Sequence, residues 1–300
     1  MQHAALALRG LGMCVALILA PAGYALGGDT TSARYLADTG SAWTLSAMPY
    51  SWLTYLNGDQ AIRGRTVSID ANPIQVLEHL DAAPWMSYVE ARRGRLVLYN
   101  DLFYAKLKVD ASRARSFDGS SLNVAADVKF EQTIVEAGAA YELARWYAGG
   151  GSKDGAPTRV TALDLVLGAR YWHQDMAIRL ALTAVIDTTD LDISGSRAVA
   201  RGGGVDWVDP LVGFRVRHQM APGREFVLRA DVGGFDVGST MSWNVLAAYG
   251  WDVAVRNGVT YSGLLGYRAL SVDYTKGSGL HRYEYDVVQH GPVVGLAVKF

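Results

Sequence analysis

The sequence predicts an all-β protein, an antiparallel up-and-down β-barrel of about twelve strands. The chain ends in a run of strict two-residue period, in which every second residue from Pro292 to the terminal Phe300 is apolar. Only a strand produces that period. Further strand-like segments fill residues 42–300, and none is apolar over the ~18 residues that a membrane helix needs. The pattern therefore favours strands throughout this part of the chain.

Twelve segments are predicted to be strands. They are residues 42–56, 60–69, 85–92, 95–109, 122–147, 159–172, 176–187, 205–217, 225–235, 241–255, 259–274 and 283–300. Asn57 and Gly58, the strongest short hairpin signal, are expected to form a turn between the first two strands. Residues 73–80 are predicted to form one short helix, since apolar residues recur at nearly helical spacing after Asn72 and Pro73. The alternatives are ten strands, if the first hairpin stands off the wall, or eight.

The connectors between the predicted strands alternate in length. Short turns are predicted at residues 173–175, 220–223 and 256–258, and longer polar loops at 148–157, 188–204 and 276–282. Residues 238–240 are an exception, a tight connector on the side of the long loops. Membrane barrels of the outer-membrane type have short periplasmic turns and longer external loops. The alternation therefore favours a transmembrane barrel whose C-terminus is periplasmic.

The N-terminus predicts export. Arg9 precedes an apolar stretch over residues 11–20, and small residues at 23 and 25 fit cleavage after Ala25. We therefore expect a signal peptide at residues 1–25, an N-terminal periplasmic segment at 26–41 and one barrel domain at 42–300. Cys14, the single cysteine, lies in the signal peptide, so no disulfide is expected in the mature chain.

The residue types on the two faces of each predicted strand indicate which face points outward. In residues 240–255 one parity carries Val245 with aromatic residues toward both ends, as in the two girdles of a membrane barrel. The other parity carries small and polar groups such as Ser242 and Asn244, which suits a crowded lumen. The aromatic residues expected on the lipid-facing side and in the girdles are Trp243, Tyr249, Trp251, Tyr261 and Tyr267.

Several short segments resemble a poorly characterised family of small, porin-like proteobacterial outer-membrane barrel proteins. The matching segments are residues 49–52 (PYSW), 57–58 (NG), 90–94 (EARRG) leading to Asp101, 168–172 (GARYW), 207–213, 233–235 with 238–239, 266–268 (GYR) and 291–300. The resemblance implies a barrel in the bacterial outer membrane and no particular activity. It also implies that Phe300 belongs to the signal that the barrel-assembly machinery recognises.

Charged residues of both signs fall on the inward parity of neighbouring predicted strands. They are Asp164, Arg170, Asp209, Arg215, Arg217, Arg229, Asp231, Asp252, Arg268 and Asp273. A buried charge persists only when it is paired, so we expect cross-strand ion pairs. Two functions follow from this expectation. The barrel is either structural, with a lumen filled by ion pairs, or a narrow pore whose charged constriction selects small solutes.

An outer-membrane lipid-modifying enzyme and a secreted soluble β-sandwich binding protein are the alternatives. Acyl transfer needs a nucleophile such as serine beside a histidine. No histidine of the expected mature chain lies two residues from a serine on one strand face, and no cluster has metal-binding spacing. We therefore expect no enzymatic activity, no catalytic residue, no metal and no cofactor. The balance of 28 basic and 29 acidic residues gives no basic excess for nucleic acid.

The expected partners are outer-membrane lipids, lipopolysaccharide, the barrel-assembly machinery and small solutes. Basic residues gather at two connectors, Arg92, Arg93 and Arg95 at one and Lys276, His281 and Arg282 at the other. Both connectors are expected at the outer rim, where basic groups would meet lipopolysaccharide phosphates. The alternative is that these charges only keep the rim solvated.

Overall fold

The structure, a computed structural model, describes residues 42–62, 65–117, 120–150, 157–188 and 191–300. The predicted signal peptide and the segment 26–41 lie outside the described residues. The described elements, in order, are β1 (Thr44–Trp52), β2 (Tyr55–Ile62), β3 (Arg65–Ala71), α2 (Pro73–Glu78), β4 (Trp85–Arg93), β5 (Leu96–Phe117), β6 (Ser120–Gly150), β7 (Pro157–Thr188), β8 (Leu191–Ala221), β9 (Arg224–Gly233), β10 (Met241–Arg256), β11 (Val259–Lys276), η2 (Gly279–His281) and β12 (Tyr283–Lys299).

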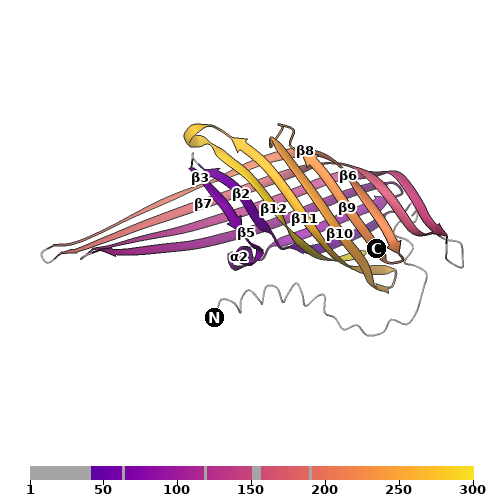
Figure 1. Ribbon diagram of the computed structural model, residues 1–300, viewed down its shortest axis with the longest axis horizontal. Coiled ribbons are helices and arrows are strands. Elements are labelled where there is room, and N and C mark those ends of the chain that lie inside the picture. Colours follow the sequence, from indigo (N-terminus) through magenta and orange to yellow (C-terminus); the bar gives the residue numbers. More distant parts are fainter. Residues whose placement is uncertain (1–41, 63–64, 118–119, 151–156, 189–190) are drawn as a thin grey trace.

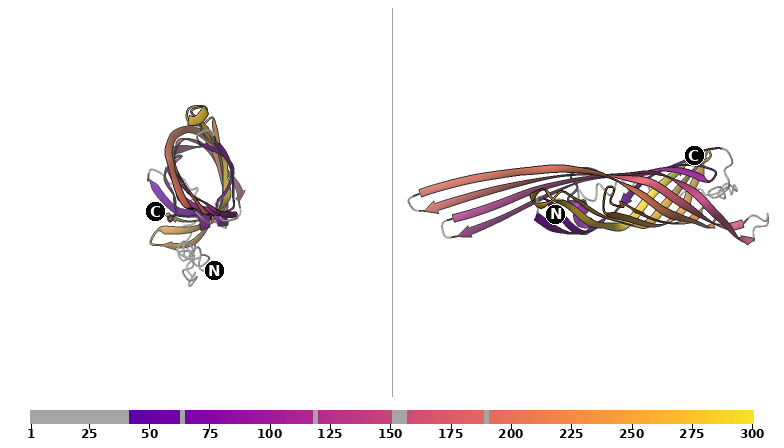
Figure 2. Two further views of the ribbon diagram at one scale, coloured as in Figure 1. Left: turned by 90° about the vertical axis from the view of Figure 1, so that its left-hand side faces the viewer. Right: turned by 90° about the horizontal axis from the view of Figure 1, so that it is seen from above.

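Ten of these strands close a barrel. Each strand from β4 to β12 pairs antiparallel with the next, and β1 pairs with both β4 and β12, which completes the ring seen end-on in Figure 2. β2 and β3 stand outside the ring, because β2 pairs with the first half of β12 and β3 pairs with β2. The predicted all-β antiparallel barrel is confirmed, with a ten-strand wall and two outside strands. The β-sandwich alternative is wrong.

The predicted turn at Asn57 and Gly58 is also wrong, because both residues lie inside β2. β1 and β2 follow one another along β12, β1 beside residues 293–299 and β2 beside residues 283–290. Between them the N–H of Leu53 donates to the carbonyl oxygen of Pro292 at 2.9 Å. Glycine is required at position 58 by close approach and not by a turn, since a Cβ there would overlap the backbone of Asp286 on β12.

The predicted turn at residues 173–175 is a third error, since β7 runs unbroken through it. Gln174 is buried and accepts a hydrogen bond from the hydroxyl of Tyr283 at 2.5 Å. The polar triplet is therefore part of a strand with one side chain facing the lumen. Residues 191–204, predicted to belong to a loop, are the first part of β8 and pair with β7 as far as Leu191.

β5, β6, β7 and β8 extend far beyond the rest of the barrel, as Figure 1 shows. β7 has 32 residues, which at about 3.3 Å per residue span about 105 Å. A bilayer core is only about 30 Å thick. The four strands remain paired with one another to their tips. We call this four-stranded extension, residues 107–117, 120–130, 176–188 and 191–203, the blade.

The strand directions assign the described connectors to one of two ends of the barrel. The C-terminus, Gly94 and the turns at residues 222–223 and 257–258 share one end, which we call the C-terminal end. The blade tips and the connectors 234–240 and 277–282 lie at the other, the blade end. The expectation of one basic rim is therefore wrong. Arg93 and Arg95 lie at the C-terminal end, opposite the 277–282 connector, and the side chain of Arg92 is buried.

The helix predicted over residues 73–80 is confirmed as α2. Asn72 begins it with a capping box, since its side chain accepts from the N–H groups of Ile74 and Gln75 at 3.0 Å. α2 buries no residue. After the helix, the backbone N–H of Asp81 donates to the carbonyl oxygen of Lys106 on β5 at 2.9 Å. The helix therefore fills no part of the lumen. In the part of the chain that the structure describes, no helix is long and apolar enough to cross a membrane.

Candidate functional site in the barrel interior

Burial alternates along the wall strands, which assigns the lumenal face. In β9, Arg229 and Asp231 are buried, whereas Leu228 and Val232 are 41% and 40% exposed. Side chains of a barrel alternate between the interior and the outside. The buried polar residues therefore face the lumen, and the lumen is the candidate functional site.

A terminal network of ion pairs fills the lumen toward the C-terminal end. Its members are Glu90, Arg92, Glu142, Arg145, Asp164, Arg215 and Arg217. Asp164 accepts from Nε of Arg215 at 2.8 Å and from Nε of Arg217 at 2.9 Å. Arg215 on β8 also reaches Glu90 on β4 at 2.7 Å. Because β5, β6 and β7 separate these two strands in the wall, this pair crosses the lumen.

A central network lies next to it on the blade side. Its members are Asp101, Glu136, Arg170, Arg229, Asp231 and Arg268. Nη2 of Arg170 lies 2.7 Å from carboxylate oxygens of both Glu136 and Asp231, and Arg229 pairs with the same two carboxylates. Arg268 on β11 reaches Asp101 on β5 at 2.8 Å, so this network also joins opposite walls.

The structure shows where each charged residue predicted to face inward lies. Seven of them belong to one or the other of the two networks: Asp164, Arg170, Arg215, Arg217, Arg229, Asp231 and Arg268. Asp209 is buried but accepts from the backbone N–H of Ser239 at 2.7 Å, and Asp252 accepts from Ser262 at 2.7 Å. Asp273 does not face inward, because it lies on the odd-numbered outer side of β11 beside Asp286, while the even-numbered residues 268–274 are buried.

Sequence reasoning missed the residues of β4, β5 and β6 that complete the networks. These are Glu90, Arg92, Asp101, Glu136, Glu142 and Arg145. The alternation of faces along a strand could have identified some of them, since Glu90 and Arg92 are two residues apart on β4 and therefore share a face. The faces are harder to separate in this half of the chain because Tyr88 and Tyr99, inside the barrel, are also aromatic, like the outer girdles.

An aromatic layer follows the central network toward the blade end. Trp207 stacks on Tyr274 with 3.9 Å between ring centroids and on Trp172 with 5.4 Å, and all three are buried. Near this layer, the side chain of Gln289 on β12 donates to Gln132 on β6 at 2.8 Å. Opposite walls of the barrel are therefore joined by the two networks and by this amide pair.

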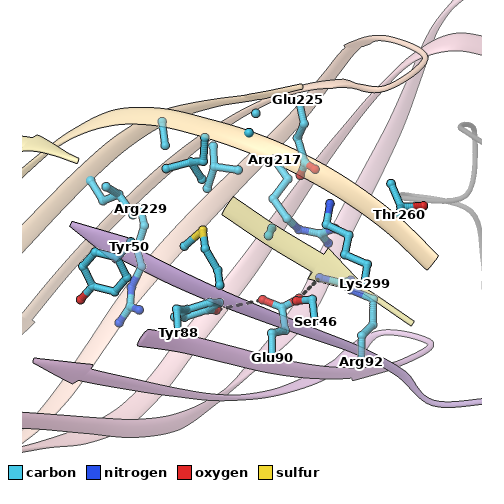
Figure 3. Close-up of a pocket in the computed structure, with 18 of the residues that line it drawn as sticks. Ser46, Tyr50, Tyr88, Glu90, Arg92, Arg217, Glu225, Arg229, Thr260 and Lys299 are labelled. Atoms are coloured by element: carbon cyan, nitrogen blue, oxygen red, sulfur yellow. Dashed lines mark hydrogen bonds and ion pairs between the residues drawn. The ribbon is translucent and has the colours of Figure 1, made fainter. Parts of the chain in front are cut away.

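A cavity of about 390 Å³ lies between the terminal network and the strands β10 to β12. Figure 3 shows Tyr88, Glu90 and Arg92 bonded in a row on one wall, with Tyr88 donating to Glu90 at 2.9 Å. It also shows the side chains of Arg217 and Glu225 directed into the cavity. The lining includes Phe300, so the cavity reaches the C-terminal end of the barrel.

The predicted girdle residues lie on the outer side of the wall. Trp251 is 38% and Tyr267 48% exposed, whereas Trp243, Tyr249 and Tyr261 are partly buried. Phe300 is exposed at the end of the wall, where its N–H donates to the carbonyl of Leu45 on β1 at 2.8 Å.

Two histidines make side-chain hydrogen bonds with a neighbouring strand, one to a carboxylate and one to a hydroxyl group. Nδ1 of His173 lies 2.6 Å from Asp206, and Nδ1 of His218 lies 2.8 Å from the hydroxyl of Thr161. Within the described residues, no three histidine, cysteine or carboxylate side chains are grouped so as to hold a metal ion.

Comparison with known proteins gives likeness only at the level of solved structures. No protein-family model matches the sequence, and no curated protein does. The Ail protein of Yersinia pestis is 12% identical with a TM-score of 0.28, covering 87% of this chain and 99% of Ail. A FadL homologue of Pseudomonas aeruginosa is 8% identical with a TM-score of 0.24, covering 86% of this chain and 89% of the homologue. OccAB2 of Acinetobacter baumannii is 7% identical with a TM-score of 0.24, covering 86% and 97%.

Proposed function

We propose that the protein is an integral outer-membrane β-barrel with a structural or narrow porin-like role, whose lumen is filled by paired charges. The observation that carries this proposal is the contrast between the two faces of the wall. Ion pairs such as Arg215 with Glu90 cross the inside, whereas large apolar side chains are exposed on the outside. A water-soluble barrel would reverse this distribution.

The outer face supports a lipid environment. Leu167, Phe214 and Leu265 are each 52% exposed, and soluble monomers rarely expose large contiguous apolar patches. Trp243 and Trp251 on β10 are eight residues apart, which is about 27 Å along a strand. At the ~35–45° tilt of membrane barrels this is about 20 Å of height, close to their apolar band of about 25 Å.

The proposal includes an orientation and two partners. Short turns at the C-terminal end fit the periplasm, and the blade end then points outward. At the blade end Lys276, His281 and Arg282 would meet lipopolysaccharide phosphates, and Arg282 already pairs with Glu284 at 2.8 Å. At the C-terminal end the exposed Phe300 is available to the barrel-assembly machinery.

Cell fractionation and gel electrophoresis test the proposal. We expect the expressed protein in the outer-membrane fraction and a shift in migration between unheated and boiled samples, because a closed barrel resists detergent until it is heated. Recovery of the folded protein from the soluble periplasm, without such a shift, would overturn the proposal.

A further inference from the structure

The connector between β9 and β10, residues 234–240, exposes apolar side chains at the blade end of the barrel. Val237 is 74% and Phe235 is 53% exposed, and Met241, the first residue of β10, is 52% exposed. A Cβ on Gly234 would lie 3.2 Å from Cα of Met241, so the two ends of the connector are adjacent. Exposed apolar side chains that lie together mark a surface that contacts a partner or a membrane. We call Phe235, Val237 and Met241 the connector patch.

Hydrogen bonds fix the backbone of the connector. The N–H of Val237 donates to the carbonyl oxygen of Gly234 at 2.9 Å. Ser239 is fully buried, and its N–H donates to the lumenal carboxylate of Asp209 at 2.7 Å. Because Ser239 is bonded toward the lumen, Phe235 and Val237 lie on the exposed side of the connector.

Two residues of the connector have an uncommon backbone conformation. Phe235 has a φ of 52° and Asp236 a φ of 59°, in the left-handed region that few residues other than glycine adopt. Such a conformation persists only where the surrounding structure holds it. The connector is therefore a fixed loop that presents Phe235 at the surface.

Charged residues on the neighbouring strands mark the level of the connector on the outer face. On one side, Met241 is the register partner of Asp273 on β11. On the other side, a Cβ on Gly238 would overlap the backbone of Val208 on β8. Asp206, two residues nearer the blade, has 56% of its side chain exposed. The outer face therefore changes from apolar to charged at the level of the connector, as expected where a membrane barrel leaves the apolar band.

Toward the C-terminal end, the connector patch continues into the apolar outer wall. Met241 and Trp243 are two residues apart on β10 and share its outer face. Val232 on β9 is the register partner of Trp243 and is 40% exposed. The patch is therefore the margin of the wall surface, and acyl chains that cover this wall also reach the patch.

We propose that the connector inserts Phe235 and Val237 among the acyl chains of the outer leaflet and so anchors the β9 and β10 side of the barrel at the outer interface. The inference rests on the proposed function, since it requires a barrel that spans the outer membrane with its blade end outward. Insertion removes two large apolar side chains from water. Apolar groups that lie at an interface are buried about 5–10 Å into the boundary between headgroups and acyl chains, so the contact is with the first part of each chain.

Fluorescence quenching tests the proposal with the full chain refolded into phosphatidylcholine nanodiscs. Cys14, the single cysteine, is replaced by serine, and Val237→Cys carries an NBD probe. A doxyl group near the headgroup end of the lipid acyl chain should quench this probe about twofold more than aqueous iodide does, because the insertion is shallow. Stronger quenching by iodide would overturn the proposal. Quenching by neither agent would also overturn it, because a second copy or another part of the chain would then cover the connector.

Two control positions separate failure of the anchor from failure of the proposed function. Leu265→Cys, on the outer face of β11 and 52% exposed, should be quenched by the doxyl lipid whenever the barrel spans the bilayer. Asp110→Cys, on the blade with 62% of its side chain exposed, should be quenched only by iodide. Lipid quenching at position 265 with iodide quenching at position 237 rejects the anchor alone. Iodide quenching at both positions rejects the proposed function as well.

A second pair of variants tests the role of the apolar side chains. Phe235→Asp should reduce lipid quenching of the probe at position 237 about twofold, because a charge resists transfer out of water. Asp236→Asn, at the residue between them, should leave it unchanged. Equal lipid quenching in the two variants contradicts the proposal.

Discussion

At the scale of residues, the lumen is organised by arginines that bind several polar partners at once. Arg170 bridges Glu136 and Asp231, and Arg268 holds Asp101 while also donating to Asn244 at 2.9 Å. The guanidinium group suits this role because its donors lie in a rigid planar fork. Removal of one partner leaves the opposite charge buried and unpaired, which is the costly case for an ion pair.

We expect Arg268→Ala to destabilise the barrel by about 3–5 kcal/mol, because Asp101 would remain buried on the opposite wall without its cation. The cation–π contact of Arg268 with Trp52, at 4.9 Å, would be lost as well. Urea unfolding in lipid vesicles measures the change. The matched control is Arg282→Ala, whose partner Glu284 lies at the solvated blade end; equal losses in the two variants would contradict a special role for the lumenal pair.

At the scale of elements, each wall strand alternates between one set of residue types on its inner face and another on its outer face. On β10 the buried Ser242, Asn244 and Ala248 alternate with Trp243 and Val245. A one-residue slip would exchange these faces, so the apolar outer side and the polar inner side together fix the register.

A charge on the outer face should therefore damage assembly more than a polar group inside. We expect Val245→Arg to cost about 2–4 kcal/mol, the value for arginine near the bilayer midplane. The lumenal control on the same strand is Gly250→Ser, because a Cβ at position 250 would meet its nearest atom at 3.8 Å. Heat-modifiable migration after refolding measures the folded fraction, and greater damage from Gly250→Ser would show that the faces are inverted.

The blade should be separable from the barrel. Its four strands pair with one another, and residues 182–188 of β7 and 191–197 of β8 lie far from the closed ring (Figure 1). We expect that replacement of residues 182–197 by Asn-Gly leaves the heat-modifiable shift unchanged. The free energy of unfolding should change by no more than about 0.5 kcal/mol, as for surface changes. Loss of the folded band would show that the blade contributes to barrel assembly.

At the scale of the whole molecule, side chains from opposite walls meet in the interior of a ten-strand barrel. A ring of about eight strands leaves room only for side chains, whereas open porins have 16–18. In the described part of the chain, the networks, the aromatic layer and the amide pair lie across the lumen beside the cavity at the C-terminal end, so we expect no wide channel.

We expect small or intermittent conductance in planar bilayers. Arg229→Ala should raise it, because this arginine pairs with both Glu136 and Asp231 in the central network. Arg93→Ala, at a turn outside the lumen, is the control. A large, steady conductance in the unmodified protein that Arg229→Ala does not change would show that the charges line an open channel.

The sequence by itself determined the fold class, the short helix and the two faces of most strands. These features follow from local information: the two-residue period of the terminal strand, the Asn72-Pro73 start of the helix, and residue types that differ between the outer face and the lumen. Seven of the charged residues in the two networks could be found in the same way, because parity is a property of one strand.

Only the tertiary structure decided how these pieces meet. Asn57 and Gly58 are a turn signal by residue type, but the close approach of Asp286 on β12 places them inside a strand. The partners of Arg215 and Arg268 lie on β4 and β5, more than a hundred residues away in the chain. Closure of the ring brings such residues together. The residue pattern of a single strand does not say which other strand lies opposite it across the lumen.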